Sequence, residues 1–291
     1  TGATTLSGGD RTLTGTTITI TSTLAGGNNA LVITGDLEID DDATGLSTLS
    51  VSGTTDLGGD VTTSGTQTYT GAVTLSTGDR TLTGSTVNFV STLAGGTNAL
   101  TITGNLDLDD TASGISTLSV SGTSNLGANV TTSGTQTYTG ATTLSGGDRT
   151  LTGTTVNFGS TMTGTGSHDL TVTGNLDLDG ALTSVVDLSV SGTSNLGANV
   201  TTTGTQTYTG ATTLSGGDRT LEGTTVNFGS TLTGTGSHDL TITGNLDLDG
   251  ALTDVVDLSV SGTSNLGANV TTSGTQTYTG ATTLSGGDRT L

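Results

Sequence analysis

Residues 239–250 read DLTITGNLDLDG, and this stretch decides the fold. Large apolar residues alternate with threonine or aspartate on both sides of Gly244. Successive side chains of a strand point to opposite faces, so the alternation predicts two short strands with one buried face and one solvated face. We expect the apolar residues to face inward and the polar ones outward: Leu240, Ile242, Leu246 and Leu248 in, Thr241, Thr243, Asp247 and Asp249 out.

The stretch belongs to a repeat that runs through the whole chain. Tyrosine recurs at 69, 138, 208 and 278, and arginine recurs in a GDR triplet at 11, 80, 149, 219 and 289. Self-similarity with a period of about 70 residues indicates a solenoid or an array. We predict one continuous solenoid over residues 1–291, with repeats at approximately 2–70, 71–139, 140–209 and 210–279 and the first coil of a fifth repeat at 280–291.

Each repeat divides at its turn glycines into four pieces, the last of which lacks about one strand: GATTLSGGDRTLEGTTVNF, GSTLTGTGSHDLTITGNLDLD, GALTDVVDLSVSGTSNL and GANVTTSGTQTYT. Strands this short cannot bury a face alone, so one piece must stack on the next. We predict an all-β fold, a β-solenoid or β-helix with about four coils per repeat. Five flatter coils of about 14 residues are the alternative. Stacking forms inward columns that include Phe89, Phe158 and Phe228 with Ile20, and Leu106, Leu176 and Leu246.

Composition limits the function. Only 29% of the residues are hydrophobic and 2% aromatic, there are 49 glycines and no proline, and the net charge is −20. Five arginines without any lysine exclude a surface that tracks nucleic-acid phosphates. The absence of cysteine excludes disulfides and thiolate sites. No apolar run approaches the roughly 18 residues of a membrane helix, so we expect no membrane span in this segment.

At TQTYTGATTL, DRTLTGTTVNFGST, LTITGNLDLDGAL and LSVSGTSNLGANVTT, the sequence resembles the β-strand repeats of very large Gram-negative surface proteins of the filamentous-haemagglutinin and autotransporter-adhesin kind. The resemblance covers the whole chain. It implies a right-handed β-helical stalk, export across the outer membrane, and a role in adhesion, biofilm or cell-surface filaments.

We therefore expect a non-enzymatic, extracellular structural protein, the shaft of a bacterial surface fibre, adhesin or matrix filament. Acidic positions recur with the repeat instead of clustering once, and no lysine is present to hold an anionic sugar, so we do not expect a glycan-cleaving enzyme. The alternative is a repetitive binding array, either an ice-binding threonine face or a scaffold for divalent cations. TTVNF, NLDLD, TSNL and TQTYT should stack on one face, where acids and asparagine interrupt the threonine rows.

Two sets of three aspartates lie five residues before mid-coil glycines and should stack at one corner of the coil, about 4.8 Å apart: Asp148, Asp169 and Asp187, and Asp218, Asp239 and Asp257. One interpretation is a turn-forming role, with water and the adjacent arginines screening the charges. The other is a bound calcium ion, the one cofactor that we consider. The first two repeats provide a control, because the same positions hold Asp10, Ala30 and Thr48, and Asp79, Ala99 and Thr117.

The chain begins and ends on the same thirteen residues, TGATTLSGGDRTL. We therefore expect equivalent coils at both ends and a partner that is the protein itself, through end-to-end stacking by strand addition or through continuation of a longer repeat chain. The predicted assembly residues are Gly2, Leu6, Leu13, Gly280, Leu284 and Leu291. We interpret His168 and His238 in GSHD as turn residues. The asparagines of N-V-T, a glycan-acceptor pattern, have the same interpretation: Asn129, Asn199 and Asn269.

Overall fold

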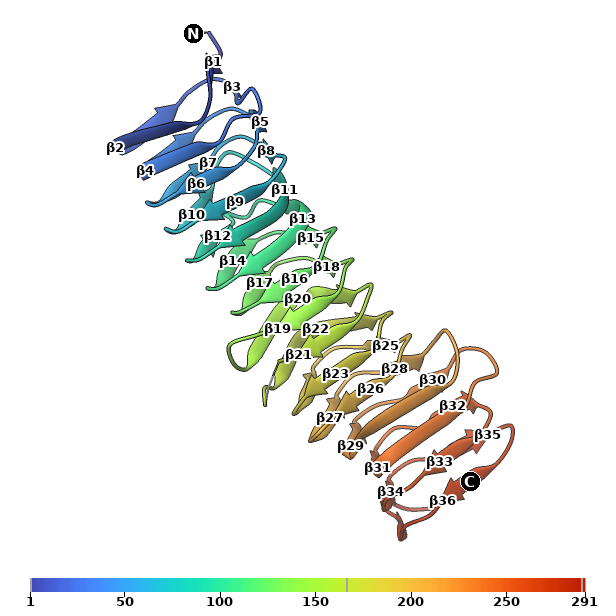
Figure 1. Cartoon of the computed structure of the whole chain (residues 1–291). Coiled ribbons are helices and arrows are strands. Elements are labelled where there is room, and N and C mark those ends of the chain that lie inside the picture. The colour runs from blue at the N-terminus through green and yellow to red at the C-terminus, as the bar shows by residue number, and fades with distance from the viewer. Residues whose placement is uncertain (1, 166, 289, 291) are drawn as a thin grey trace. The chain divides into compact units, whose positions relative to one another are not determined.

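The computed structural model describes residues 2–165, 167–288 and 290. All regular elements in these ranges are β-strands (Figure 1). The chain divides into two compact units, residues 1–142 and 143–291. Both are parallel β-solenoids, with about 15 coils in the whole chain.

The first unit contains eighteen complete strands. They are β1 (Thr4–Thr5), β2 (Arg11–Ile20), β3 (Leu24–Ala25), β4 (Leu31–Ile39), β5 (Ala43–Leu46), β6 (Leu49–Val51), β7 (Thr55–Leu57), β8 (Val61–Thr63), β9 (Thr66–Tyr69), β10 (Val73–Leu75), β11 (Arg80–Phe89), β12 (Leu93–Ala94), β13 (Leu100–Leu108), β14 (Ala112–Ile115), β15 (Leu118–Val120), β16 (Ser124–Leu126), β17 (Val130–Thr132) and β18 (Gln136–Tyr138).

β19 (Thr142–Leu144) lies at the division, and the strands of the second unit follow it. They are β20 (Arg149–Phe158), β21 (Met162–Gly164), β22 (Leu170–Leu178), β23 (Leu182–Val185), β24 (Leu188–Val190), β25 (Ser194–Leu196), β26 (Val200–Thr202), β27 (Thr205–Tyr208), β28 (Thr212–Leu214), β29 (Arg219–Phe228), β30 (Leu232–Gly234), β31 (Leu240–Leu248), β32 (Leu252–Val255), β33 (Leu258–Val260), β34 (Ser264–Leu266), β35 (Val270–Thr272), β36 (Gln276–Tyr278) and β37 (Thr282–Leu284).

A coil of this solenoid has three sides, and each side contributes a strand to a parallel ladder. The coil made by β5, β6 and β7 pairs side by side with the coil made by β8, β9 and β10. The pairs are Ala43 with Val61, Leu49 with Gln67, and Thr55 with Val73. Main-chain hydrogen bonds therefore join successive coils on all three sides.

The coils are of nearly constant length, about 19 residues per turn. One column of paired residues in the first unit follows this spacing: Thr4, Leu24, Ala43, Val61 and Leu82. The length agrees with about four coils per repeat, so the predicted fold class is confirmed. The alternative of five flatter coils per repeat is wrong.

The repeat and the coil do not have the same phase. In the first unit, four coil steps lead from Leu13 through Ile33, Val51 and Tyr69 to Phe89. They pass beyond Leu82, the repeat equivalent of Leu13, which pairs with Val61 and Ile102 on another side of the solenoid. The prediction that the shortest piece of the repeat forms a short coil of its own is therefore wrong. Coils keep their length, so the second repeat begins one side of the coil earlier than the first.

The predicted inward orientation of the column residues is confirmed, but Ile20 and Phe89 lie in different columns, because Ile20 pairs with Ile39 and Phe89 pairs with Tyr69. The three phenylalanines are 0–1% exposed, Ile20 is 6% exposed, and the three leucines are 1–3% exposed: Phe89, Phe158 and Phe228, and Leu106, Leu176 and Leu246. Rings of adjacent coils stack, with centroids 5.4 Å apart for Tyr69 and Phe89 and 5.3 Å apart for Tyr208 and Phe228. The thin core is thus continuous along the column despite the low apolar content.

Glycine is required where the long strands cross a corner of the coil. Gly174 has φ +133°, and a Cβ atom there would lie 1.8 Å from the carbonyl oxygen of Gly153 in the preceding coil. The ladder between β20 and β22 shifts register at this point, between the pairs of Thr152 and Thr155. Glycine therefore lets two coils approach closely while the strand turns from one side to the next.

Candidate functional site

The two aspartate trios stack as the coil register predicts. The register of β20, β22 and β24 places Asp148, Asp169 and Asp187 at one corner of three successive coils. β29, β31 and β33 place Asp218, Asp239 and Asp257 in the same way.

Each carboxylate in such a column accepts a main-chain hydrogen bond from the next coil. Oδ1 of Asp148 accepts from the N–H of Asp169 at 3.1 Å, and Oδ1 of Asp169 accepts from the N–H of Asp187 at 3.1 Å. In the control repeat, Oδ1 of Asp10 accepts in the same manner from the N–H of Ala30, at 2.8 Å. This bond forms whether or not the next residue is acidic, and it stabilises the ionised carboxylate. The aspartates therefore act as corner-capping residues in early and late repeats alike.

A metal role for these aspartates stays a prediction. In the ranges that the structure describes, no three His, Cys, Asp or Glu side chains are grouped so that they could hold a metal ion. The imidazole Nδ1 of His238 lies 3.9 Å from Oδ1 of Asp218, at the first corner of the later trio. Calcium would have to bind through the carboxylate oxygens that the main chain leaves unused.

Arginine side chains fold back onto their own turns. Arg219 donates from Nε to the carbonyl of Leu196 at 3.0 Å, from Nη1 to that of Asp218 at 2.6 Å, and from Nη2 to that of Ser215. Burial lowers its pKa, and the neighbouring Asp218 carboxylate partly offsets this effect. The other described arginines also donate to carbonyl oxygens of the preceding turn: Arg11, Arg80 and Arg149. These guanidinium groups are thus committed to the fold.

The glutamine and the tyrosine of TQTYT at 205–209 are buried, which the sequence analysis did not predict. Gln206 and Tyr208 are both 0% exposed. The phenol donates to Oε1 of Gln206 at 3.0 Å, and Nε2 of Gln206 donates to the carbonyl oxygen of Glu222 at 2.7 Å. Burial raises the pKa of Tyr208. The alternation of TQTYT contained the signal, since glutamine occupies an inward position two residues before tyrosine.

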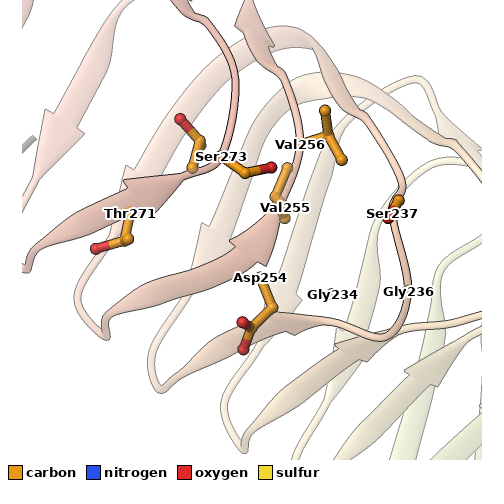
Figure 2. Close-up of a pocket in the computed structure, with 9 residues that line it drawn as sticks. Gly234, Gly236, Ser237, Asp254, Val255, Val256, Thr271 and Ser273 are labelled. Atoms are coloured by element: carbon orange, nitrogen blue, oxygen red, sulfur yellow. The ribbon is translucent and has the colours of Figure 1, made fainter.

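A pocket of about 410 Å³ lies beside the expanded GSHD turn at residues 236–239 (Figure 2). Asp254, Ser237, Thr271 and Ser273 are among its lining residues, and Asp254 has φ +59°. One carboxylate and several hydroxyl groups line it, and His238 is not part of the lining. The lining therefore lacks the paired acid and base that hydrolysis of a glycosidic bond requires.

A shallow groove recurs on the outer surface where NLDLD lies beside TSNL. In the second unit it measures about 260 Å³ in one repeat and about 320 Å³ in the next. Asp177 of the first groove accepts hydrogen bonds from Nδ2 of Asn157 at 3.3 Å and of Asn195 at 2.8 Å. The carboxylate is thus held by amides of the two adjacent coils.

The predicted stacking order on this face is partly wrong. TTVNF, NLDLD and TSNL do lie on successive coils. TQTYT precedes TTVNF, because Tyr208 pairs with Phe228, and TSNL is followed by TTL, because Ser264 pairs with Thr282. The outward residues of the column still alternate between threonine, amide and acid, as expected: Thr207, Asn227, Asp247, Asn265 and Thr283.

The predicted assembly residues occupy the first and last described coils. Leu6 is 8% exposed and donates its N–H to Ala25, Leu13 is partly exposed, and Gly2 and Gly280 are exposed and partly exposed. Leu284 is 52% exposed, whereas its repeat equivalents Leu75 and Leu214 are 1% exposed. Leu291 lies outside the described residues. The last described coil therefore leaves part of an apolar column uncovered.

The N-V-T asparagines are exposed and cap turns. Oδ1 of Asn199 accepts from the N–H of Thr220 at 3.0 Å, and Oδ1 of Asn269 accepts from that of Thr290 at 3.1 Å. Asn129 is likewise exposed. This agrees with their interpretation as turn residues.

In the described ranges, the structure contains no helix long and apolar enough to cross a membrane. The fold and the repeated corners define a parallel β-solenoid. No protein-family model, curated protein or solved structure matches the chain.

Proposed function

We propose that this chain is a non-enzymatic, extracellular structural protein that forms the shaft of a bacterial surface fibre, adhesin or matrix filament. The observation that carries the proposal is the three-sided ladder. Within each unit, parallel main-chain hydrogen bonds join consecutive coils, and buried apolar columns support them from inside. Tension along such a unit loads many interstrand bonds together, which suits a load-bearing element.

The surface chemistry supports a solvated shaft. The net charge is −20, and the four described arginines donate their guanidinium hydrogens to carbonyl oxygens of the preceding turns. Carboxylates and threonine hydroxyls therefore dominate the exterior. Repulsion between like charges discourages side-by-side collapse of neighbouring molecules.

Growth of the shaft occurs end to end in this proposal. A further coil of the same repeat, in the same polypeptide or in another copy, covers the uncovered side of Leu284 and continues the ladder. The register offers a template, because β37 already pairs with β34 in the way that β28 pairs with β25 inside the unit.

Immunogold electron microscopy tests the location. Antibodies raised against this chain are applied to intact and to permeabilised cells of the source organism. We expect gold particles along filaments on intact cells. Labelling only after permeabilisation would overturn the extracellular assignment.

Analytical ultracentrifugation tests the assembly. We expect the mean mass of the chain to rise with concentration, and Leu284→Asp to abolish this rise. Thr283→Asp, on the outward face of the same strand, is the control with equal charge and should still associate. Concentration-independent monomers in all three proteins would contradict end-to-end stacking.

A further inference from the structure

One side of the first unit carries a regular array of hydroxyl groups that is separate from the acidic grooves. Four consecutive coils each contribute two outward residues in the pattern T-x-T, T-x-T, S-x-S, T-x-T. Paired strands place the first residues of each pattern in register, and ladder hydrogen bonds continue through the second residues. We name this set the threonine array: Thr81, Thr83, Thr101, Thr103, Ser119, Ser121, Thr137 and Thr139.

The array is two-dimensional, and its backing is rigid. Hydroxyl-bearing residues repeat about 4.8 Å apart between coils and about 6.7 Å apart along each strand. The residues between them, Leu82, Ile102, Val120 and Tyr138, are 0% exposed and fix the strands from inside. The hydroxyl of Ser121 also accepts the N–H of Gly104 at 3.0 Å. The outward groups therefore hold their positions without help from a ligand.

The chemistry of the array suits ordered water. Its threonines combine a hydroxyl with a methyl group, its two serines add hydroxyls, and none of the side chains is charged. An uncharged patch of this kind is distinctive on a chain with a net charge of −20. Charged groups and long flexible side chains would impose their own hydration, whereas fixed hydroxyls at two regular spacings close to those of the prism face of ice can join its lattice. We propose that the threonine array binds ice.

Other copies in the chain provide natural variants. The second unit holds an identical copy: Thr150, Thr152, Thr171, Thr173, Ser189, Ser191, Thr207 and Thr209. In the copy that follows it, Glu222 stands opposite Thr243 and introduces a charge. In the copy nearest the N-terminus, Val32 stands opposite Thr12. Two intact arrays and two interrupted ones are therefore present, and only the intact ones should bind ice at full strength.

Ice recrystallisation inhibition and thermal hysteresis of the whole chain test the proposal. The double variant Thr103→Glu and Thr173→Glu places a charge in both intact arrays, as Glu222 does naturally. The matched control is Thr123→Glu and Thr193→Glu, two exposed threonines outside the arrays, of which Thr193 lines an acidic groove. Circular dichroism and the melting temperature report whether each variant folds.

The wild type and the control should inhibit recrystallisation at the same concentration, and the array variant should need about tenfold more protein. Glu222→Thr should improve inhibition, because it completes a third array at an exposed position. This gain keeps the test decisive if the double variant fails to fold. No inhibition by the wild type, or equal losses in the array and control variants, would overturn the proposal. The immunogold microscopy tests the shaft function independently of this proposal.

Discussion

Replacing Phe228 by alanine should open the solenoid locally. Its ring is 1% exposed and stacks on Tyr208, with an interplanar angle of 15°. Truncation of a buried phenylalanine costs about 3–5 kcal/mol, through lost burial and the cavity left behind. The stacked geometry adds about 0.5–1.5 kcal/mol for an aromatic pair. We therefore expect a loss near the upper end of that range.

The loss should stay near the substitution, because a coil contacts only its neighbours. Hydrogen exchange with mass spectrometry measures this directly, since the free energy of local opening is obtained peptide by peptide. Peptides that contain β27, β29 and β31 should lose most of their protection, while those from β4 to β8 should keep it. Phe228→Ile is the matched control, because Ile20 occupies the equivalent position of the first repeat, and it should cost less than about 1.5 kcal/mol. Uniform loss of protection in both units, or a local change below about 1 kcal/mol, would refute the reasoning about the column.

Three further outcomes are expected. Gly174→Ala should unpair β20 from β22 and lower the free energy of unfolding by more than the roughly 1–3 kcal/mol of a disfavoured backbone conformation. The control Gly229→Ala should have little effect on the melting temperature, because its Cβ would meet atoms no closer than 3.4 Å. Burial raises the pKa of Tyr69, Tyr138 and Tyr208 above the ordinary 10.0, so the unfolded chain loses these protons first and the free energy of unfolding should fall as the pH rises above about 10. The absorbance of their phenolates should appear only on unfolding, and titration of all tyrosines before unfolding would contradict this. Calcium and a chelator should leave the melting temperature unchanged, because the corner carboxylates already accept main-chain hydrogen bonds, and a calcium-dependent rise that Asp169→Asn removes would instead support the metal interpretation.

Alternation within short stretches was enough to predict the fold class and the inward residues. Each side chain of DLTITGNLDLDG has the orientation that a two-residue period requires, since Leu240 and Ile242 are buried and Thr243 is exposed. The aspartate corners were also predictable, because the distance from aspartate to the mid-coil glycine is the same in successive coils. Local periodicity therefore determined both features.

The side of the coil on which each repeat begins could not be predicted from the turn glycines. Cutting every repeat at the same glycines assumes that equivalent residues begin equivalent coils, and the pairing of Tyr208 with Phe228 shows that they do not. The ladder favours coils of nearly constant length, because each residue must meet a partner in the next coil. Each repeat is about one strand shorter than four whole coils, so the next repeat begins on a different side of the coil. The threonine array was missed for this reason, since it forms only when QTYT follows LSVS in the stack.

The shift of each repeat to a different side also decides where the hydroxyl arrays and the acidic grooves lie on the surface. In the first unit, the copy that contains Val32 lies over the column of Leu13, and the threonine array lies over the column of Leu82, on another side. A repeat long enough to fill four whole coils would place every array and every acidic groove on one side. In the first unit, the natural period instead places successive copies on different sides, so that uncharged hydroxyls and carboxylates are shared between sides. A shorter run of like charges or of uncharged hydroxyls on one side offers less surface for side-by-side pairing with a neighbouring molecule, so the phase difference itself disfavours lateral aggregation of this repetitive β-structure.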